Sequence, residues 1–508
     1  MPTYLSPGVY VEEVEAGARP IEGVGTAVAA FVGLAGKGPL NTATLVTNWS
    51  QFTQTFGEFV EGSYLAHSVY GYFTNGGGAC YVVRVGGNGD GSGGPKARGE
   101  LPSGVKGELG GLLVTARDEG VGGRIVVEVT DPGEGASEDQ FKLVVRQDGK
   151  VEEEYDKVTA KKGKQHVVTV VNAQSKLIQL TEPTTGGPLD KPQKGSVTLT
   201  EPAARRRLEP DDYVGNTADR SGFGGLESID PITMVCVPDL MAAYRQGMID
   251  LEGVQAVQLA MIAHCELMGD RVAILDPPPG LNAQQIREWR VDKVGYDSKY
   301  AVLYWPWIKV FDPAGGENVF VPPSGHVAGI WGRNDDSRGV HKAPANEVVR
   351  GAIALEIQIT KNEHDLLNPH GINCLRAFPG RGIRVWGART LSSDPGWRYL
   401  NIRRLFNYLE ESILNGTQWC VFEPNDPTLW AKMRRTIAAF LVNEWRKGAL
   451  FGLTPEQAFY VKCDDETNSA ESIDAGMVVC EIGIAPVKPA EFVIFRLAQF
   501  SGGASLTE

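Results

Sequence analysis

The stretch that decides the fold is residues 426–448, which read DPTLWAKMRRTIAAFLVNEWRKG. Asp426 can cap a helix whose first turn contains Pro427, and Gly448 follows directly after the last basic turn. In between, apolar residues recur at steps of three or four, which predicts an amphipathic helix from about Pro427 to Lys447. The inward positions are Trp430, Met433, Ile437, Leu441 and Trp445, and the basic outer stripe contains Lys432, Arg435, Asn443 and Arg446.

A second helix of the same design is expected just before the first, from about Arg398 to Asn415. Its pattern places Ile402, Phe406, Leu409 and Ile413 inward and Arg403, Arg404, Glu410 and Glu411 outward. Five of the ten Trp residues fall between positions 386 and 445, which is typical of a large packed core. We expect both helices to lie against one sheet.

Upstream of this stretch, strand-like and helix-like segments alternate. Strands are expected at Thr26–Ala35, Cys80–Val85, Ile232–Val237, Arg271–Leu275 and Tyr300–Trp305, and helices at Ser50–Phe56, Tyr64–Phe73, Glu252–Met268 and Asn282–Val291. The alternation predicts an α/β (α+β) core. Because nucleotide-binding and hydrolase domains show the same alternation, an α/β enzyme with an inserted β-sandwich stays the alternative function.

Composition changes after the glycine-rich segment 86–95, and between Glu100 and Pro210 only Phe141 and Tyr155 are aromatic. Short strands with turn signals follow one another, and Gln147–Lys150 is a hairpin turn by its Asp-Gly pair. The expected strands are Leu112–Ala116, Ile125–Val129, Phe141–Arg146, Val167–Val171, Leu177–Leu180 and Val197–Thr200. We expect an inserted all-β, sandwich-like domain with a solvated surface.

Both ends of the chain carry short extended segments. The first contains Val9, Tyr10, Val11 and Val14, and a glycine-containing tether at 16–25 follows it. The last contains Phe492, Val493, Ile494 and Phe495, and it follows a tether at Pro486–Pro489. Unpaired strands favour addition to a neighbour's sheet. The alternatives are a disordered tail for the first segment and an internal edge strand covered by a helix for the last.

Charge and cysteine content exclude several classes of partner. A formal net charge of -13 argues against binding to duplex DNA or an anionic membrane, because neutralising phosphates requires clustered Lys and Arg. The seven Cys residues are scattered without a Cys-x-x-Cys pair, which indicates reduced thiols and assembly in the cytoplasm. A signal peptide and a long apolar run are both missing from the sequence, so we expect no membrane insertion.

Motifs of catalysis and metal binding are also missing. The sequence has no Gly-x-Ser-x-Gly elbow, no Gly-x-Gly-x-x-Gly opening a helix and no His-Glu-x-x-His. Glu363, His364, Asp365 and His370 form the best metal candidate, but a single helix cannot present both His residues across Asn368-Pro369. His326 and His341 are interpreted as buried or interface hydrogen-bonding residues. We expect no catalytic residue, metal or cofactor.

Two blocks of sequence resemble contractile tail sheath proteins, the sheath subunits of contractile phage tails and related bacterial injection systems. The first block reads LNPHGIN at 367–373, FPGRGIRVWGARTL at 378–391 and WRY at 397–399. The second reads PPSGHVAG at 322–329 and RGVHKAPAN at 338–346. The resemblance covers residues 1 to about 90 and everything from about residue 220 onward, and leaves the middle of the chain outside it.

The resemblance implies a structural protein that assembles with itself into a six-fold helical sheath around an inner tube, together with baseplate and terminator or cap proteins. It implies that a metastable extended sheath contracts, that both ends exchange strands between subunits, and that the insert faces outward. The chain then divides into an N-terminal arm and tether (1–25), the first part of the sheath core (26–90), the inserted outer domain (91–212), the α/β middle part of the core (213–362), the C-terminal inner core (363–486) and the C-terminal arm (487–508).

The charge of the two predicted helices differs in sign from that of the whole chain. Between Arg398 and Gly448, eight Lys or Arg residues stand against five Asp or Glu residues. A local basic excess suggests a face that meets an acidic partner. Lys432, Arg435 and Arg446 are therefore candidates for contacts with the inner tube, and an ordinary solvated helix face is the alternative.

Overall fold

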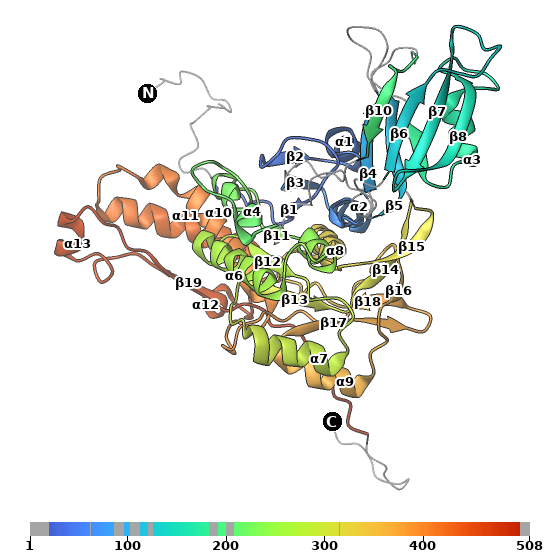
Figure 1. The fold of residues 1–508 in the computed structure, drawn as a ribbon. Coiled ribbons are helices and arrows are strands. Elements are labelled where there is room, and N and C mark those ends of the chain that lie inside the picture. Colours follow the sequence, from blue (N-terminus) through green and yellow to red (C-terminus); the bar gives the residue numbers. More distant parts are fainter. Residues whose placement is uncertain are drawn as a thin grey trace, which may run out of the picture. The chain divides into compact units, whose positions relative to one another are not determined.

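The computed structural model describes residues 20–60, 62–85, 96–101, 112–119, 125–181, 191–199, 208–313 and 315–497. The chain divides into two compact units (Figure 1). The larger unit comprises residues 1–59, 63–86 and 209–508, and the smaller comprises 60–62 and 87–208. Each unit is described by itself.

An eight-stranded sheet forms the centre of the larger unit, in the order β18-β17-β13-β12-β11-β1-β3-β2. Its strands are β1 (Val28–Gly33), β2 (Thr44–Val46), β3 (Ala79–Arg84), β11 (Met234–Cys236), β12 (Val272–Leu275), β13 (Ala301–Trp305), β17 (Ile372–Phe378) and β18 (Gly382–Val385). The inner pairs are parallel, whereas β18 and β2 add antiparallel edges. The strands predicted from apolar runs are confirmed, because strands buried on both faces are apolar throughout.

Helices and a small second sheet surround these strands. The helices are α1 (Trp49–Phe56), α2 (Leu65–Asn75), α4 (Pro210–Val214), α5 (Asp239–Arg245), α6 (Leu251–Met268), α7 (Ala283–Glu288), α8 (Ser324–Arg338) and α9 (Lys361–Leu367), with a π-helix, η2 (Trp289–Val294), continuing α7. The second sheet has the order β15-β14-β16, from β15 (Glu317–Val321), β14 (Ile308–Asp312) and β16 (Ala352–Leu355). Short 3-10 helices lie at η1 (Gly224–Ser228), η3 (Asn368–His370) and η4 (Gln418–Cys420).

The block Pro322–Gly329 begins α8 at its closest contact with α2. A Cβ atom on Gly325 would lie 2.4 Å from the Ser68 Cα, and one on Gly329 would lie 2.3 Å from the Tyr72 carbonyl oxygen. Both glycines therefore allow the two helix backbones to approach within a distance that any side chain would prevent.

The C-terminal part of the larger unit contains the two helices predicted first. They are α10 (Leu400–Gly416) and α11 (Pro427–Arg446), followed by α12 (Pro455–Ala458), β19 (Phe459–Lys462), α13 (Ala470–Asp474) and β20 (Glu481–Ile484). The Asp426 carboxylate accepts a hydrogen bond from the Leu429 amide at 2.8 Å, as a helix cap does. Leu405 and Leu409 of α10 share one apolar cluster with Ile437 and Leu441 of α11, and β19 and β20 pack against this cluster.

The prediction that Arg403 and Arg404 point outward from α10 is wrong, because both side chains are buried. The Arg403 guanidinium lies 4.7 Å from the Tyr300 ring centroid and 4.6 Å from that of Trp397. Arg404 forms an ion pair with Asp335, with 2.5 Å between Nη2 and Oδ2, and donates to the Thr26 carbonyl. Residues far away in sequence provide these partners, so the helical pattern alone does not reveal them.

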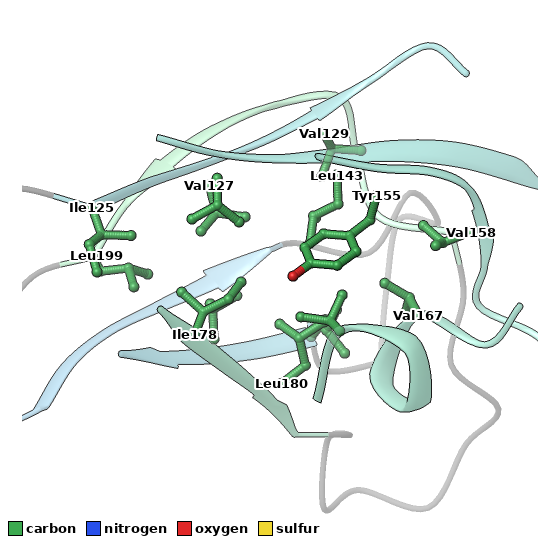
Figure 2. Packing of buried hydrophobic residues seen from close by; sticks show 14 of the residues in the cluster. Ile125, Val127, Val129, Leu143, Tyr155, Val158, Val167, Ile178, Leu180 and Leu199 are labelled. Carbon is green, nitrogen blue, oxygen red and sulfur yellow. The ribbon is translucent and has the colours of Figure 1, made fainter. Parts of the chain in front are cut away.

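In its described residues, the smaller unit consists of two antiparallel sheets and one helix. One sheet has the order β10-β6-β7-β8 and the other β4-β5-β9. The strands are β4 (Lys96–Leu101), β5 (Leu112–Glu119), β6 (Ile125–Thr130), β7 (Gln140–Gln147), β8 (Lys150–Thr159), β9 (Ile178–Thr181) and β10 (Gly195–Thr198), and the helix is α3 (Val167–Gln174). Figure 2 shows side chains of both sheets and of α3 pointing into one apolar interior.

The smaller unit differs from expectation at α3 and at the unpredicted strands β4 and β8, and it agrees at one turn. Residues 167–171 form the first turns of α3 and not a strand, so the unit is not all-β. Strand β8 was not predicted, because its sequence, KVEEEYDKVT, is mostly charged and lacks the apolar residues that mark a strand. The turn between β7 and β8 is confirmed, since Asp148 and Gly149 have φ values of 52° and 80°, as a two-residue hairpin turn requires.

Candidate assembly surfaces

Within the C-terminal arm, residues 492–497 present apolar side chains to solvent. Phe492, Val493, Ile494 and Phe495 are 72%, 68%, 78% and 85% exposed, and no strand forms within the described residues 491–497. The alternative of an edge strand covered by a helix is therefore wrong for this chain. Figure 1 shows the arm running past α9 and away from the sheet. Burying such side chains yields about 1.5 to 3 kcal/mol each, so this surface favours a partner.

The arm begins at a defined anchor. The Glu491 carboxylate accepts hydrogen bonds from Arg389 Nε and Nη2 at 2.8 and 2.6 Å, from Asn368 Nδ2 at 2.8 Å and from the Tyr399 hydroxyl at 3.1 Å. Burial alone would raise the pKa of Glu491, but the hydrogen bonds from Arg389 and Asn368 outweigh burial and hold this pKa below its usual value. The anchor therefore keeps Glu491 ionised and fixes where the arm leaves the core.

The tether expected before the arm is held in place at Pro486-Val487. The Val487 amide donates to the Ala449 carbonyl at 3.2 Å, and Asn401 Nδ2 donates to the Val487 carbonyl at 3.1 Å. Pro486 also forms an isolated antiparallel bridge with Leu450. In this chain the segment thus has little of the slack that a loose connector would give.

The N-terminal strand candidates Val9, Tyr10, Val11 and Val14 lie outside the described residues. The described end of the expected tether, residues 20–25, packs on α10. Ile21 is buried in the cluster shared by α10 and α11, and the Val24 amide donates to Ser412 Oγ at 3.1 Å. A Cβ on Gly23 would lie 2.0 Å from the Tyr408 hydroxyl oxygen, so a larger residue here would displace the Tyr408 side chain.

Strands β19 and β20 form a two-stranded ribbon. In the part of the chain that the structure describes, neither strand pairs with a third one. Val461 and Ile482 pack toward α11, whereas Tyr460 is exposed on the opposite face. A two-stranded sheet is marginally stable alone, and its free edges present backbone N–H and C=O groups that another strand can pair with.

The basic stripe predicted on α11 is present as a surface. Lys432, Arg435 and Arg446 are all exposed. At 100° per residue they fall within about 60° of arc, and about 21 Å of helix axis separates the first from the last. Lys432 Nζ lies 4.1 Å from the Trp419 ring centroid, which leaves its charge at the surface. Arg434 turns the other way and donates to the Cys463 carbonyl.

The histidines weighed as metal ligands do not converge. Among the residues that the structure describes, no three His, Cys, Asp or Glu side chains are arranged to hold a metal ion. Glu363 instead closes a capping box with Thr360 at the start of α9, and His364 is buried. His326 is buried beside Gly71, and burial lowers its pKa to about 4. Burial also lowers the pKa of His341.

Two buried carboxylates were missed from the sequence. Asp276 follows β12 and accepts hydrogen bonds from the Ser324 amide at 3.1 Å and hydroxyl at 2.5 Å, where α8 begins. Asp239 accepts from the Leu34 and Leu65 amides and the Ser63 hydroxyl.

Burial raises the pKa of Asp276 to about 7 and that of Asp239 to about 6. These carboxylates tie strand ends to helix starts. Their only visible signal in the sequence is an Asp close after an apolar strand.

A cavity of about 270 Å³ lies beside α10. Its lining includes Val28, Asp230, Asp270, Arg404, Tyr408 and Glu411. The cavity is slightly smaller than typical small-molecule sites, and Arg404 is already neutralised by Asp335. None of the residues predicted as assembly sites lines it.

No helix in the described ranges has both the length and the apolar character needed to cross a bilayer.

Two family profiles match the chain. One is described as the phage tail sheath protein central domain and covers residues 233–391, and the other as the phage tail sheath C-terminal domain and covers residues 392–500. Together they run without a gap over more than half of the 508 residues.

Curated relatives carry the same description. A tail sheath protein of Vibrio phage KVP40 is 26% identical over 47% of this chain and 38% of its own length. A putative prophage major tail sheath protein of Pseudomonas aeruginosa is 27% identical over 48% of this chain and 61% of its own length. The chain thus spans between about a third and three fifths of the length of these relatives.

Solved structures share the fold over nearly the full length. The helical sheath of the anti-feeding prophage in its contracted state gives a TM-score of 0.60 at 24% identity, covering 98% of this chain and 100% of that one. The sheath complex of an extracellular contractile injection system, PVC, in its contracted state gives 0.58 at 22% identity, covering 98% and 99%.

Proposed function

The chain belongs to the phage tail sheath family, and on that premise we propose that it is a structural sheath subunit. It polymerises with copies of itself into a six-fold helical cylinder around an inner tube. Contraction of the cylinder drives the tube through a target envelope. The work comes from better packing of subunits in the contracted lattice and not from catalysis, so the chain is not an enzyme.

One observation carries this proposal: an exposed apolar arm and an incomplete sheet occur in the same molecule. Residues 492–495 have the side chains of a strand but no strand partner within the described chain, while the β19–β20 ribbon has edges that no described strand covers. If the arm pairs with a neighbour's ribbon through main-chain hydrogen bonds, the arm gains a strand partner and one free edge of the ribbon is covered. Val9, Tyr10, Val11 and Val14 supply the second donated strand.

The partners follow from the same arrangement. The names of the related structures include a sheath and a baseplate, which supports self-assembly and attachment to a baseplate. The exposed stripe of Lys432, Arg435 and Arg446 is the surface proposed for the inner tube. Terminator or cap proteins close the cylinder. The smaller unit, with its charged surface strand β8, is proposed to face outward and to be dispensable for assembly.

Truncation of the arm tests the proposal. We expect the full-length chain, co-expressed with its tube protein, to form hollow cylinders by negative-stain microscopy. Deleting residues 492–508 should abolish them and leave a folded, soluble subunit, because the anchor at Glu491 is retained. Deleting only residues 498–508 is the matched control and should preserve the cylinders.

Two outcomes would contradict the proposal. Cylinders from the longer deletion would show that residues 492–495 do not join subunits. A full-length chain that remains a compact particle in the presence of its tube would favour the alternative, an α/β enzyme with an inserted domain.

A further inference from the structure

The ribbon carries two cysteines in direct register. Antiparallel pairing runs from Phe459 opposite Ile484 to Lys462 opposite Glu481, and continuing this register by one residue beyond the paired strands would place Cys463 opposite Cys480. Residues directly opposite in an antiparallel pair have Cα atoms about 4.5 to 5.5 Å apart and side chains on the same face. Disulfides need Cα atoms about 4.4 to 6.8 Å apart, so the spacing that the continued register implies is compatible with a disulfide.

The two thiols lie close together. Cys480 packs against the apolar cluster that contains Cys463, each thiol affects the pKa of the other, and both are free thiols in this structure. Asn468 holds the segment around them, since its side chain donates to the Cys463 sulfur at 3.8 Å and to the Val479 carbonyl at 3.0 Å. The side-chain Oδ1 of Asn468 also accepts a hydrogen bond from the Val479 amide at 2.6 Å. This network ties the residue that follows β19 to the residue just before Cys480.

Access distinguishes this pair from the other cysteines. Cys80, Cys236, Cys265 and Cys374 are buried in the larger unit. Cys480 is partly exposed and Cys463 is buried behind it, against Trp430 of α11. A third, partly exposed thiol, Cys420, packs against the same cluster. An oxidant can therefore reach Cys480 from solvent, and Cys463 lies ready to resolve the product.

We propose that Cys463 and Cys480 form an oxidation site that takes a low-molecular-weight disulfide, such as oxidised glutathione, and closes a cross-strand disulfide. The Cys480 thiolate attacks one sulfur of the external disulfide, forms a mixed disulfide and releases one thiolate. The Cys463 thiolate then attacks the Cys480 sulfur and releases the second thiolate. Two protein thiols are oxidised, one external disulfide is reduced to two thiols, and the two protein protons pass to the leaving groups.

The disulfide would link the two strands covalently at the open end of the ribbon. It would also close the segment 464–479, which includes α13, into a loop. Oxidation would thus convert a ribbon that frays into one that is closed covalently. The reaction would be slow at neutral pH, because burial raises the pKa of Cys480 to about 12 and also raises that of Cys463. At pH values below this pKa, the rate should increase about tenfold for each unit by which the pH is raised, because the thiolate fraction increases in the same proportion.

The test uses the folded full-length chain and oxidised glutathione at pH 7 and pH 9. We expect peptide mass spectrometry without reduction to find Cys463 linked to Cys480, about a hundredfold faster at the higher pH. Amide hydrogen exchange in β19 and β20 should slow after oxidation. Cys420→Ser is the matched control and should leave the linkage intact, whereas Cys480→Ser and Cys463→Ala should each prevent it.

Three results would overturn the proposal. One is linkage of Cys420 to Cys480 as the main product in the unaltered chain. Another is a stable glutathione adduct on Cys480 that Cys463 does not resolve. The third is linkage only after denaturation. The isolated chain suffices for all of these measurements, so their outcome is independent of whether the subunit forms a sheath.

Discussion

Helices α10 and α11 are neighbours with the same kind of sequence pattern and opposite outcomes. In α11 the basic residues Lys432, Arg435 and Arg446 are exposed as predicted. In α10 the basic residues Arg403 and Arg404 are buried. Amphipathic periodicity locates the apolar stripe of a helix, but it does not decide whether a charged residue at the margin of that stripe faces water. That depends on partners supplied by distant segments.

The largest expected effect comes from breaking the buried pair on α10. Arg404→Ala should lower the free energy of unfolding by about 3 to 5 kcal/mol, because it leaves the Asp335 carboxylate buried without a counter-charge. Urea unfolding followed by Trp fluorescence measures the change. Arg435→Ala on α11 is the matched control and should change it by less than about 0.5 kcal/mol. Equal effects of the two substitutions would remove the distinction between the helices.

The second prediction concerns His326, a buried base without a counter-charge, in contrast to the ion-paired Arg404. His326 lies between α8 and α2, with His67 nearby, and burial lowers its pKa from 6.5 to about 4. The unfolded chain therefore binds the proton more readily, so the contribution of His326 to stability is complete above pH 6.5 and is lost as the pH falls from 6.5 toward 4. The loss reaches about 3 kcal/mol at most.

The variant His326→Gln isolates this contribution, because glutamine does not titrate in this range. The free energy of unfolding of the variant should fall less steeply between pH 6.5 and 4 than that of the unaltered chain. Parallel curves for the two proteins would mean that His326 keeps an ordinary pKa in the fold.

A smaller effect is expected at the stacked arginine of α10. Arg403→Lys keeps the charge but loses the planar group that contacts the Tyr300 and Trp397 rings, together with the hydrogen bond from Arg403 Nε to Asn407. We expect a loss of about 1 to 2 kcal/mol in the free energy of unfolding. Thermal unfolding of the variant, compared with Lys432→Arg on α11, measures it. No difference between the two would argue that Arg403 contributes charge alone.

The smallest effect on stability should come from the exposed stripe of α11. Reversing Lys432, Arg435 and Arg446 to Glu should change the free energy of unfolding by less than about 0.5 kcal/mol per residue. If the stripe meets the tube, assembly on the tube should nevertheless stop, and sedimentation with the purified tube protein would detect this. Normal tube-filled cylinders from the variant would leave the stripe as an ordinary solvated face.

The sequence predicted those elements whose environment is determined by their own residues. Parallel strands buried on both faces, such as residues 301–305, could be predicted because an apolar run is visible in the sequence itself and needs no knowledge of distant residues. The helix α3 was mistaken for a strand because Val167–Val171 is rich in β-branched residues, and tertiary packing overrode that preference. Strand β8 was missed because its outer positions are charged. Local preference thus failed wherever the environment of a segment is created by the rest of the chain.

The candidate sites show the same division. The arm at 492–495 and the stripe on α11 could be named from the sequence, because an apolar run after prolines and a basic helical face are local patterns. The anchor at Glu491 could not be named, since Arg389, Asn368 and Tyr399 come together only in the fold. The Cys463–Cys480 pair likewise depends on the register between two strands.

The anchor has a mechanical consequence. Arg389, which holds Glu491, has its amide and carbonyl groups bonded to the Asn373 side chain at 2.7 and 2.8 Å, and Asn373 belongs to β17 of the central sheet. If the arm joins subunits as proposed, tension on it would pass from Glu491 through Arg389 into a sheet whose strands share load along many hydrogen bonds. Hinge motion between subunits would be confined to the residues beyond Glu491. The folded part of the subunit would then move as a rigid body when the arm is pulled and would not stretch.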